Sequence, residues 1–432
     1  MFDAVNNSGL KQQRRIVKFV NLFAPMNKRK SLLLFTFLLT LQSVSGQGFR
    51  INNQGVKVSG MGGYACAVAR DASAAFYNPA AISRLETSQI TAGVGIVFPR
   101  ISYLDPYAGN VDMDPSISLP FHVYGVTKLK GKFTAGIALY TPFSENTSWD
   151  ESWSGKYISV NYRFRSLNIQ PVISYAFNDV FAFGAGPVLS WMGMKREFAI
   201  DVASASASYG MAEQKSASSS FGYTAALHAK FSKVALGLTY RSKIKHSPDK
   251  GEVTYSNISS GADILENITS SSSFSSEITE PASLDAGLAW DINPSLQLTI
   301  NGSYTMWSAL ENFNTTFGTD RDELQLLNYE DALSFSAGGN YKYTEKMTFR
   351  AGIGFTKSHV ADGYLSPAHP DADQFIYSGG ISYTLKKNIN LDLSLMVRDY
   401  KSRNESENIN YNFKGDYKST LYITGIGINY EF

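Results

Sequence analysis

The sequence has one cysteine, Cys66, in 432 residues, and only 18% of its residues are charged. A single cysteine excludes an internal disulfide bond and any metal site built from several cysteines. The mean hydropathy is slightly negative, at -0.16. After residue 46 no uninterrupted apolar run reaches about 18 residues, the length that a membrane-spanning helix needs. The sequence therefore excludes a disulfide-rich domain and a bundle of transmembrane helices.

Motifs of known catalytic sites are also missing. Neither H-E-x-x-H nor G-x-S-x-G occurs, and the five histidines are scattered. One segment holds several metal-binding residue types: His359, Asp362, His369, Asp371 and Asp373. They could bind a cation, but the ligand spacing of a calcium loop is absent, which favours a solvated acidic loop. We therefore predict no enzyme activity, no cofactor and no metal site.

Positive charge is concentrated before residue 47. The formal net charge is +2, but residues 1–46 hold seven lysines and arginines and one acidic residue. The rest of the chain has 32 basic and 36 acidic residues, a net charge of −4. Nothing in this distribution indicates nucleic-acid binding.

Aromatic residues make up 13% of the chain, and it has 35 glycines. Both are typical of β-rich proteins. The last stretch, 419–432, alternates as a strand does, with side chains pointing to opposite faces. One face is apolar in the middle and aromatic at both ends: Tyr422, Thr424, Ile426, Ile428, Tyr430 and Phe432. The other face carries glycines and then polar residues. This pattern predicts a strand that crosses a bilayer between lipid and a lumen.

The same period of two recurs in about fourteen segments. They are 89–99, 119–129, 133–140, 166–177, 180–198, 221–231, 234–244, 283–292, 296–307, 333–343, 347–356, 374–385, 390–400 and 419–432. Short turns alternate with long polar connections, as in outer-membrane barrels. A soluble sandwich also alternates in sequence, but it has no reason to sort its loops by length. The predicted fold class is all-β, a closed transmembrane antiparallel β-barrel of about 14 strands.

The chain divides into four predicted parts. Residues 26–46 have the basic start, short apolar core and small final residues of a secretory signal peptide. Residues 1–25 are a doubtful upstream extension, because Met26 fits as the true start. Residues 47–88 are rich in small residues and predict compact loops and one-turn helices, and the barrel follows at 89–432. With both termini in the periplasm, the long loops are extracellular, and the terminal Phe432 resembles the signal read by the barrel assembly machinery.

Two short motifs lie close together before the barrel, Asp71-Ala72-Ser73 and Asn78-Pro79-Ala80. Further motifs follow in order: Thr141-Pro142-Phe143, Trp153-Ser154-Gly155-Lys156-Tyr157, Tyr240-Arg241-Ser242, Pro281-Ala282-Ser283, Trp307-Ser308 and Phe349-Arg350-Ala351-Gly352. In these motifs the chain resembles the outer-membrane transporters of long-chain fatty acids and aromatic hydrocarbons. The resemblance covers essentially the whole chain after residue 46.

The resemblance implies that residues 47–88 form a plug, or hatch, inside the barrel lumen. Asn78, Pro79 and Ala80 would then belong to the hatch element that meets the barrel wall. A ligand would enter from the extracellular loops, bind between plug and wall, and pass after the hatch rearranges. The implied exit is a lateral opening through a kinked strand, and the short segment 133–140, which ends before Pro142, is compatible with a kink.

Candidate ligand contacts follow from the chemistry of such a cargo. Burial of an alkyl chain is favourable by about 0.8 kcal/mol per methylene, whereas a carboxylate removed from water needs a partner. Lys195 and Arg196 are the candidates for that partner, with solvated rim charges as the alternative. Phe49, Phe76 and Tyr77 are candidates for lining the pocket, with plain packing of plug against wall as the alternative.

The predicted function is passive uptake of hydrophobic small molecules, either long-chain fatty acids or aromatic hydrocarbons, through a plugged barrel in the bacterial outer membrane. The alternatives are a general water-filled porin, a structural barrel, or an outer-membrane enzyme or adhesin. The expected partners are the ligand, outer-membrane lipid and the barrel assembly machinery. Region 199–220 is polar where the family has apolar loop clusters, which leaves the identity of the transported compound open.

Overall fold

The computed structural model describes residues 51, 53–105, 109–201, 209–258, 273–317 and 321–432. The predicted signal peptide at 26–46, the upstream residues 1–25 and the candidate ligand residue Phe49 lie outside the described residues.

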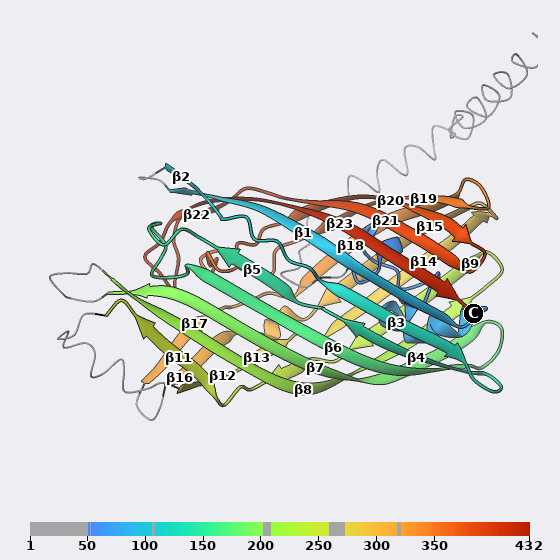
Figure 1. Ribbon diagram of the computed structural model, residues 1–432, viewed down its shortest axis with the longest axis horizontal. Coiled ribbons are helices and arrows are strands. Elements are labelled where there is room, and N and C mark those ends of the chain that lie inside the picture. Colours follow the sequence, from blue (N-terminus) through green and yellow to red (C-terminus); the bar gives the residue numbers. More distant parts are fainter. Residues whose placement is uncertain (1–50, 52, 106–108, 202–208, 259–272, 318–320) are drawn as a thin grey trace, which may run out of the picture. The chain divides into compact units, whose positions relative to one another are not determined.

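Within the described residues, fourteen antiparallel strands form one closed barrel (Figure 1). They are β1 (Gln89–Asp105), β3 (Phe121–Lys128), β4 (Phe133–Tyr140), β6 (Asn161–Ala176), β7 (Phe181–Ile200), β8 (Gly210–Lys230), β9 (Val234–Arg241), β14 (Ser283–Asn293), β15 (Leu296–Thr305), β18 (Ala332–Lys342), β19 (Met347–Thr356), β20 (Gln374–Lys386), β21 (Ile389–Tyr400) and β23 (Gly415–Glu431). Gln89 of β1 pairs with Val126 of β3 on one side and with Glu431 of β23 on the other. The last strand therefore closes the ring onto the first, as predicted.

The two faces of the strands differ as the alternation predicts. In β23, Tyr422, Ile426 and Tyr430 are exposed while Ile423 and Asn429 between them are buried. A neighbouring strand shows the same division, with exposed leucines alternating with buried polar residues along β21. An exposed apolar face and a buried polar face are the arrangement of a barrel in lipid.

Connections at one end of the barrel are short, such as the turn between β6 and β7, and those at the other end are long. We call these the short-turn end and the long-loop end; the C terminus lies at the short-turn end (Figure 1). The long connections carry short strands that the sequence analysis treated as loop: β2 (Gly109–Asp112), β5 (Ser144–Ser148), β10 (Ile244–His246), β11 (Gly251–Ser256), β12 (Ser273–Ser276), β13 (Ile278–Glu280), β16 (Asn312–Phe317), β17 (Arg321–Leu326) and β22 (Arg403–Glu405).

Region 199–220, at the ends of β7 and β8, shows why strand residues in the long connections were missed. The prediction of a polar loop there is wrong for residues 210–220, which belong to β8 and pair with β7 as far as Ile200↔Gly210. Their Ser and Ala side chains lack the apolar alternation that marks a strand facing lipid. The ladder nevertheless continues, because pairing of backbone groups requires no particular side chain.

The helices are short. They are α3 (Val56–Ser59), α4 (Ala74–Tyr77), and the 3-10 helices η2 (Pro79–Arg84) and η3 (Trp307–Ala309). No helix among the described residues is long and apolar enough to cross a membrane.

The N-terminal segment, residues 53–85, contacts strands from different parts of the ring. Its helix α3 contacts β20, β21, β23 and β1, whereas η2 contacts β4, β6, β7 and β8. In Figure 1 the segment (blue) lies among the strands toward the short-turn end. One buried apolar cluster joins this segment to the wall through Phe76 and Tyr140, and another fills the long-loop end around Trp149, Trp153 and Trp307.

Glycines of the wall allow the backbone of the N-terminal segment to approach closely. A Cβ at Gly237 of β9 would overlap the Cys66 carbonyl group, and a Cβ at Gly352 of β19 would overlap Met61 and the backbone of Gly62. Both obstacles are backbone atoms, which have little freedom to move aside. These positions therefore require glycine as long as the segment stays in place.

We expect Gly237→Val to displace the N-terminal segment while the barrel remains closed. Overpacking of this kind costs about 1–3 kcal/mol, so trypsin should cut at the buried Lys57 about tenfold faster than in the unchanged protein. The control is Gly193→Val on β7, where a Cβ meets no atom within 4 Å. Limited proteolysis followed by mass spectrometry measures both, and equal protection of the two variants would contradict the packing argument.

Candidate functional site

Asn78 connects the N-terminal segment to the wall. Its side-chain oxygen caps η2 by accepting from the amides of Ala80 (3.0 Å) and Ala81 (3.2 Å). Its Nδ2 donates to the Cys66 carbonyl at 2.8 Å and to the Leu227 carbonyl of β8 at 3.0 Å. One buried amide thus satisfies two helix donors, one loop carbonyl and one wall carbonyl. Pro79, at the first position of η2, has no N–H group, so it leaves no donor there that needs an acceptor.

A buried ion cluster forms a second connection. Lys57 of α3 lies 3.2 Å from Asp71 and 3.8 Å from Asp392 of β21, and all three side chains are buried. Burial alone would raise the pKa of Asp71, but Lys57 and two hydrogen bonds from Ser73 outweigh it and hold this pKa below its ordinary value of 3.8. Asp71 is therefore ionised at neutral pH, and the cluster fixes α3 against the wall.

The two aromatic candidates in the segment are packed rather than open to a cavity. Phe76 stacks edge-on against Tyr140 (4.7 Å between centroids) and lies under the Arg241 guanidinium at 4.4 Å. Phe76 and Tyr77 border a void of only about 10 Å³, which is hardly enough for one water molecule. In this conformation the space beside them is too small for a hydrocarbon ligand.

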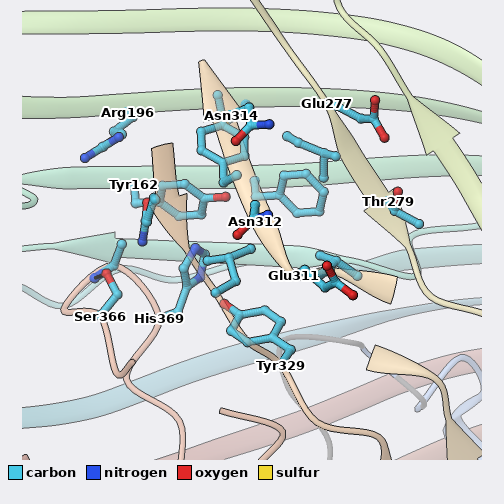
Figure 2. A pocket seen from close by; sticks show the side chains of 18 of the residues that line it. Tyr162, Arg196, Glu277, Thr279, Glu311, Asn312, Asn314, Tyr329, Ser366 and His369 are labelled. Atoms are coloured by element: carbon cyan, nitrogen blue, oxygen red, sulfur yellow. Dashed lines mark hydrogen bonds between the residues drawn. The ribbon is translucent and has the colours of Figure 1, made fainter. Parts of the chain in front are cut away.

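A larger cavity, of about 330 Å³, lies at the long-loop end. Apolar groups on its wall include Phe164, Met194, Ile278, Leu310, Phe313 and Leu327, and polar groups include Arg196, Glu277, Glu311, Asn312, Gln325 and His369. Figure 2 shows Arg196, Tyr162, His369 and Tyr329 around this space. Burial raises the pKa of Tyr329 above its ordinary value, so this phenol stays neutral. A cavity with both apolar and polar walls suits a molecule with a polar group and a hydrocarbon part.

The structure separates the two basic candidates. Arg196 lines the larger cavity, where its guanidinium packs 4.6 Å over the Phe198 ring. Lys195, the next residue of β7, does not line it and instead forms ion pairs with Glu197 (2.5 Å) and Glu213 (2.7 Å). Of the two, only Arg196 is placed to meet a ligand in the lumen, because adjacent residues of a strand face opposite ways.

A smaller cavity, of about 100 Å³, lies between the start of the N-terminal segment and the wall. Ile51 and Asn53 border it on one side, and Val97, Pro99, Leu421 and Ile423 border it on the other. Arg398 of β21 also lines it and is buried. Its Nη2 donates to Asn53 Oδ1 at 3.2 Å, while its Nε has no hydrogen-bond partner among the described residues.

Arg398 is a candidate functional residue that the sequence analysis did not name. Its position on the lumen face of a spanning strand was visible in the alternation of 390–400. A cation on such a face is costly and usually functional. An arginine at a lumen-facing position of a predicted spanning strand is therefore the signal that points to this residue. The structure shows the consequence, a buried guanidinium with a spare donor in a cavity whose wall mixes apolar side chains with polar ones, among them Glu145 and Asp371.

The third barrel strand is interrupted beside the smaller cavity. After Tyr140, three residues of this strand oppose two of β6 before pairing resumes at Ser144↔Arg165. The freed carbonyls of Thr141 and Pro142 accept hydrogen bonds from the Gln54 side chain (2.5 Å) and the Ile51 amide (2.7 Å). The break at Pro142 is therefore bound by the N-terminal segment.

The acidic segment 357–373 does not gather around a common point. Its histidines have separate carboxylate partners, with His359 3.0 Å from Asp371 and His369 2.7 Å from Glu145. In the part of the chain that the structure describes, no group of three or more His, Cys, Asp or Glu side chains is arranged to hold a metal ion.

Comparison with known proteins gives a family match over residues 37–432, to the model described as outer membrane protein transport protein (OMPP1/FadL/TodX). The chain is 24% identical to the long-chain fatty acid transport protein of Escherichia coli K12, over 94% of this chain and 98% of that protein. It is 25% identical to the protein of the same name from Salmonella typhi, again over 94% and 98%.

Solved structures show the same fold. A Pseudomonas aeruginosa FadL homologue matches with a TM-score of 0.79 at 18% identity, covering 89% of this chain and 100% of that one. The toluene transporter TodX of Pseudomonas putida matches with a TM-score of 0.66 at 15% identity, covering 90% and 99%.

We expect Asp71→Asn to destabilise the folded protein by about 3 kcal/mol, because it leaves a buried lysine with one distant partner. Asp71 has a lowered pKa, so its contribution to stability is complete above the ordinary pKa of 3.8 and is lost as the pH falls through the lower folded value. Calorimetry between pH 7 and pH 2 should therefore show a larger acid-dependent loss of stability in the unchanged protein than in the variant.

The control for that experiment is Asp150→Asn. Asp150 accepts the same two hydrogen bonds, from the amide (2.8 Å) and hydroxyl (2.5 Å) of the serine two residues on, but it is exposed and has no lysine partner among the described residues. Its replacement should change stability by less than about 0.5 kcal/mol. Equal losses in the two variants would contradict the role assigned to the ion cluster.

Proposed function

The chain belongs to the family of outer membrane transport proteins (OMPP1/FadL/TodX), and we propose that its cargo is a long-chain fatty acid or a related amphiphile that it admits by passive diffusion. The protein is a multi-pass barrel of the bacterial outer membrane and a transporter of hydrophobic compounds. The observation that carries the choice of cargo is the buried, incompletely bonded Arg398 in the smaller cavity.

The proposed route runs from the long-loop end inward. We place the long loops outside the cell and the short turns in the periplasm, because the C-terminal strand ends at the short-turn end. A ligand first enters the larger cavity and then reaches the smaller cavity beside the N-terminal segment. There its alkyl chain meets Val97, Leu421 and Ile423, and its carboxylate meets Arg398. Each methylene that leaves water contributes about 0.8 kcal/mol.

Residues 47–88 serve as the hatch in this proposal. Ile51 and Asn53 border the smaller cavity and Gln54 binds the break at Thr141. A ligand that displaces Asn53 from Arg398 would therefore loosen the same stretch that covers the interrupted strand. The proposed passage is a rearrangement of this stretch, with the break at Pro142 as a lateral exit.

Two further proposals concern the chain ends. Residues 26–46 would act as a signal peptide that is removed on export. Phe432, which is 62% exposed, would be recognised by the barrel assembly machinery, and its amide then donates to the Ser88 carbonyl at 2.9 Å to complete the seam.

We expect Arg398→Met to weaken fatty acid binding by about tenfold to a hundredfold, since a hydrogen bond to a charged group is worth about 1.5–3 kcal/mol. Binding of an alcohol of equal chain length should change little. Titration calorimetry of the detergent-solubilised protein measures both ligands. The control is Arg163→Met, an exposed arginine on the outer face of β6; equal weakening of acid and alcohol by Arg398→Met would overturn the carboxylate assignment.

A general water-filled porin is the alternative that conductance separates. We expect the unchanged protein to show little steady conductance in planar bilayers and a protein lacking residues 53–85 to show a large one. The deletion removes the elements that contact the wall toward the short-turn end. A large steady pore in the unchanged protein would contradict the plugged arrangement.

A further inference from the structure

The larger and the smaller cavity share one side chain, that of His369. Toward the larger cavity its imidazole packs against the Tyr162 ring, with 4.3 Å between the centroids (Figure 2). Its Nδ1 donates to the carboxylate of Glu145, which lines the smaller cavity, at 2.7 Å. Both side chains are mostly buried, with 13% and 15% exposed. His369 and Glu145 therefore form the partition between the two spaces.

The partition belongs to the tip of the connection 357–373, which docks on the strand β5. The Thr147 hydroxyl donates to the Ala368 carbonyl at 3.2 Å, and the Trp149 indole donates to the Pro367 carbonyl at 3.1 Å. With the contact between His369 and Glu145, three hydrogen bonds hold the tip to this side of the lumen. None of them is covalent, so the tip can separate from β5 without unfolding the barrel.

The base of the same connection is held more firmly. His359 is fully buried between the rings of Trp307 and Tyr329, each 4.4 Å from it between centroids. Arg403 donates to the Val360 carbonyl at 2.8 Å. Movement of the connection is therefore confined to its tip, which is the part that separates the cavities.

Three basic side chains follow one another in space along this part of the lumen. Arg196 lines the larger cavity, His369 stands at the partition and Arg398 lines the smaller cavity. Among the ion pairs of the described residues, only the middle group is held by a carboxylate of the protein, that of Glu145. A ligand carboxylate that takes the place of Glu145 gives the imidazole a new charge-assisted hydrogen bond, so only Glu145 loses its partner. A hydrocarbon that parts the same pair leaves both the donor and the carboxylate without partners, and an alcohol offers the imidazole only a neutral acceptor, so both are less favourable than the acid.

We propose that His369 and Glu145 form a gate that selects for carboxylate-bearing amphiphiles, and that the ligand opens it by replacing Glu145 as the acceptor of His369. This inference rests on the proposed uptake function and adds the step that determines its specificity. Hydrocarbons and alcohols fill the larger cavity but pass the gate slowly. Acids are handed from Arg196 to His369 and then to Arg398.

A reversible cross-link tests whether the tip must move. Thr147→Cys/Ala368→Cys places one thiol on each side of the docking contact, where the Thr147 hydroxyl and the Ala368 carbonyl lie 3.2 Å apart, and a flexible bifunctional methanethiosulfonate reagent joins them until a reductant is added. The native Cys66 does not interfere, because burial and the nearby Asp285 raise the pKa of its thiol to about 12 and keep it unreactive. The control pair is Ser88→Cys/Thr127→Cys at the short-turn end, where the native hydroxyls lie 3.0 Å apart.

The position of the ligand is read by photolabelling of the protein in lipid nanodiscs. The probes are a long-chain fatty acid with a diazirine on its chain and the alcohol of the same length, and mass spectrometry identifies the labelled residues. With the tip cross-linked, label from the acid should stay in the larger cavity, around Phe313, and decrease at least tenfold at Val97 and Ile423. Reductant should restore it, and the control cross-link should have no effect.

Charge selection has its own comparison. In the unchanged protein the acid should label the smaller cavity at least tenfold more than the alcohol, and Glu145→Gln should reduce this difference, since the amide holds His369 less strongly. If the amount of label in the smaller cavity is the same with and without the tip cross-link, the gate is overturned. Equal labelling by acid and alcohol in the unchanged protein would overturn the exchange. Absence of label from both cavities, with the tip free, would overturn the proposed function itself.

Discussion

The structure depends on one constraint, that every backbone amide and carbonyl within lipid must find its partner inside the protein. Fourteen strands meet it by closing β1 onto β23. Closure leaves an enclosed lumen whose surface is set by the alternation of side chains, and this lumen must then be filled. The N-terminal segment fills the short-turn end with small residues, and wall glycines such as Gly237 allow its backbone to approach.

The two ends of the lumen are filled in different ways: the larger cavity lies within the packing of the long-loop end, and the smaller cavity lies between the N-terminal segment and the wall. Toward the short-turn end, polar groups such as Asn78 and Lys57 bind the N-terminal segment to the wall. At the long-loop end, stacked rings such as Trp149 and Trp153, 4.5 Å apart, support the outer connections. A ligand site formed between two such packed regions opens when one stretch of one region shifts, which requires no change in the barrel.

Local alternation in the sequence predicts the strands, but it predicts little of the contacts between residues distant in the chain. Strand positions and faces were predicted well because exposed and buried residues alternate along most of β21 and β23. Arg398 lies on the lumen face that the alternation of 390–400 predicts, but alternation alone does not mark it as a candidate site residue. The contact between His369 and Glu145 joins residues 224 positions apart, so no spacing rule reveals it. Outer strands such as β11 lack lipid contact and therefore lack its sequence pattern.

A transporter of oily molecules has no need of buried cations if hydrocarbon is its only cargo. Burying the guanidinium of Arg398 lowers stability unless an anion offsets it, and although Glu145 and Asp371 line the same cavity, neither forms an ion pair with it among the described residues. Among the described residues its hydrogen-bond partners are neutral, the amide oxygen of Asn53 and the phenol of Tyr400. An apolar side chain would fill the same space with less loss. The arginine is therefore best explained by a ligand that brings the missing negative charge. By the same reasoning, Glu145 and the ligand carboxylate compete for the hydrogen bond from His369. In the proposed route, charge rather than apolar area then decides which hydrophobic molecule passes.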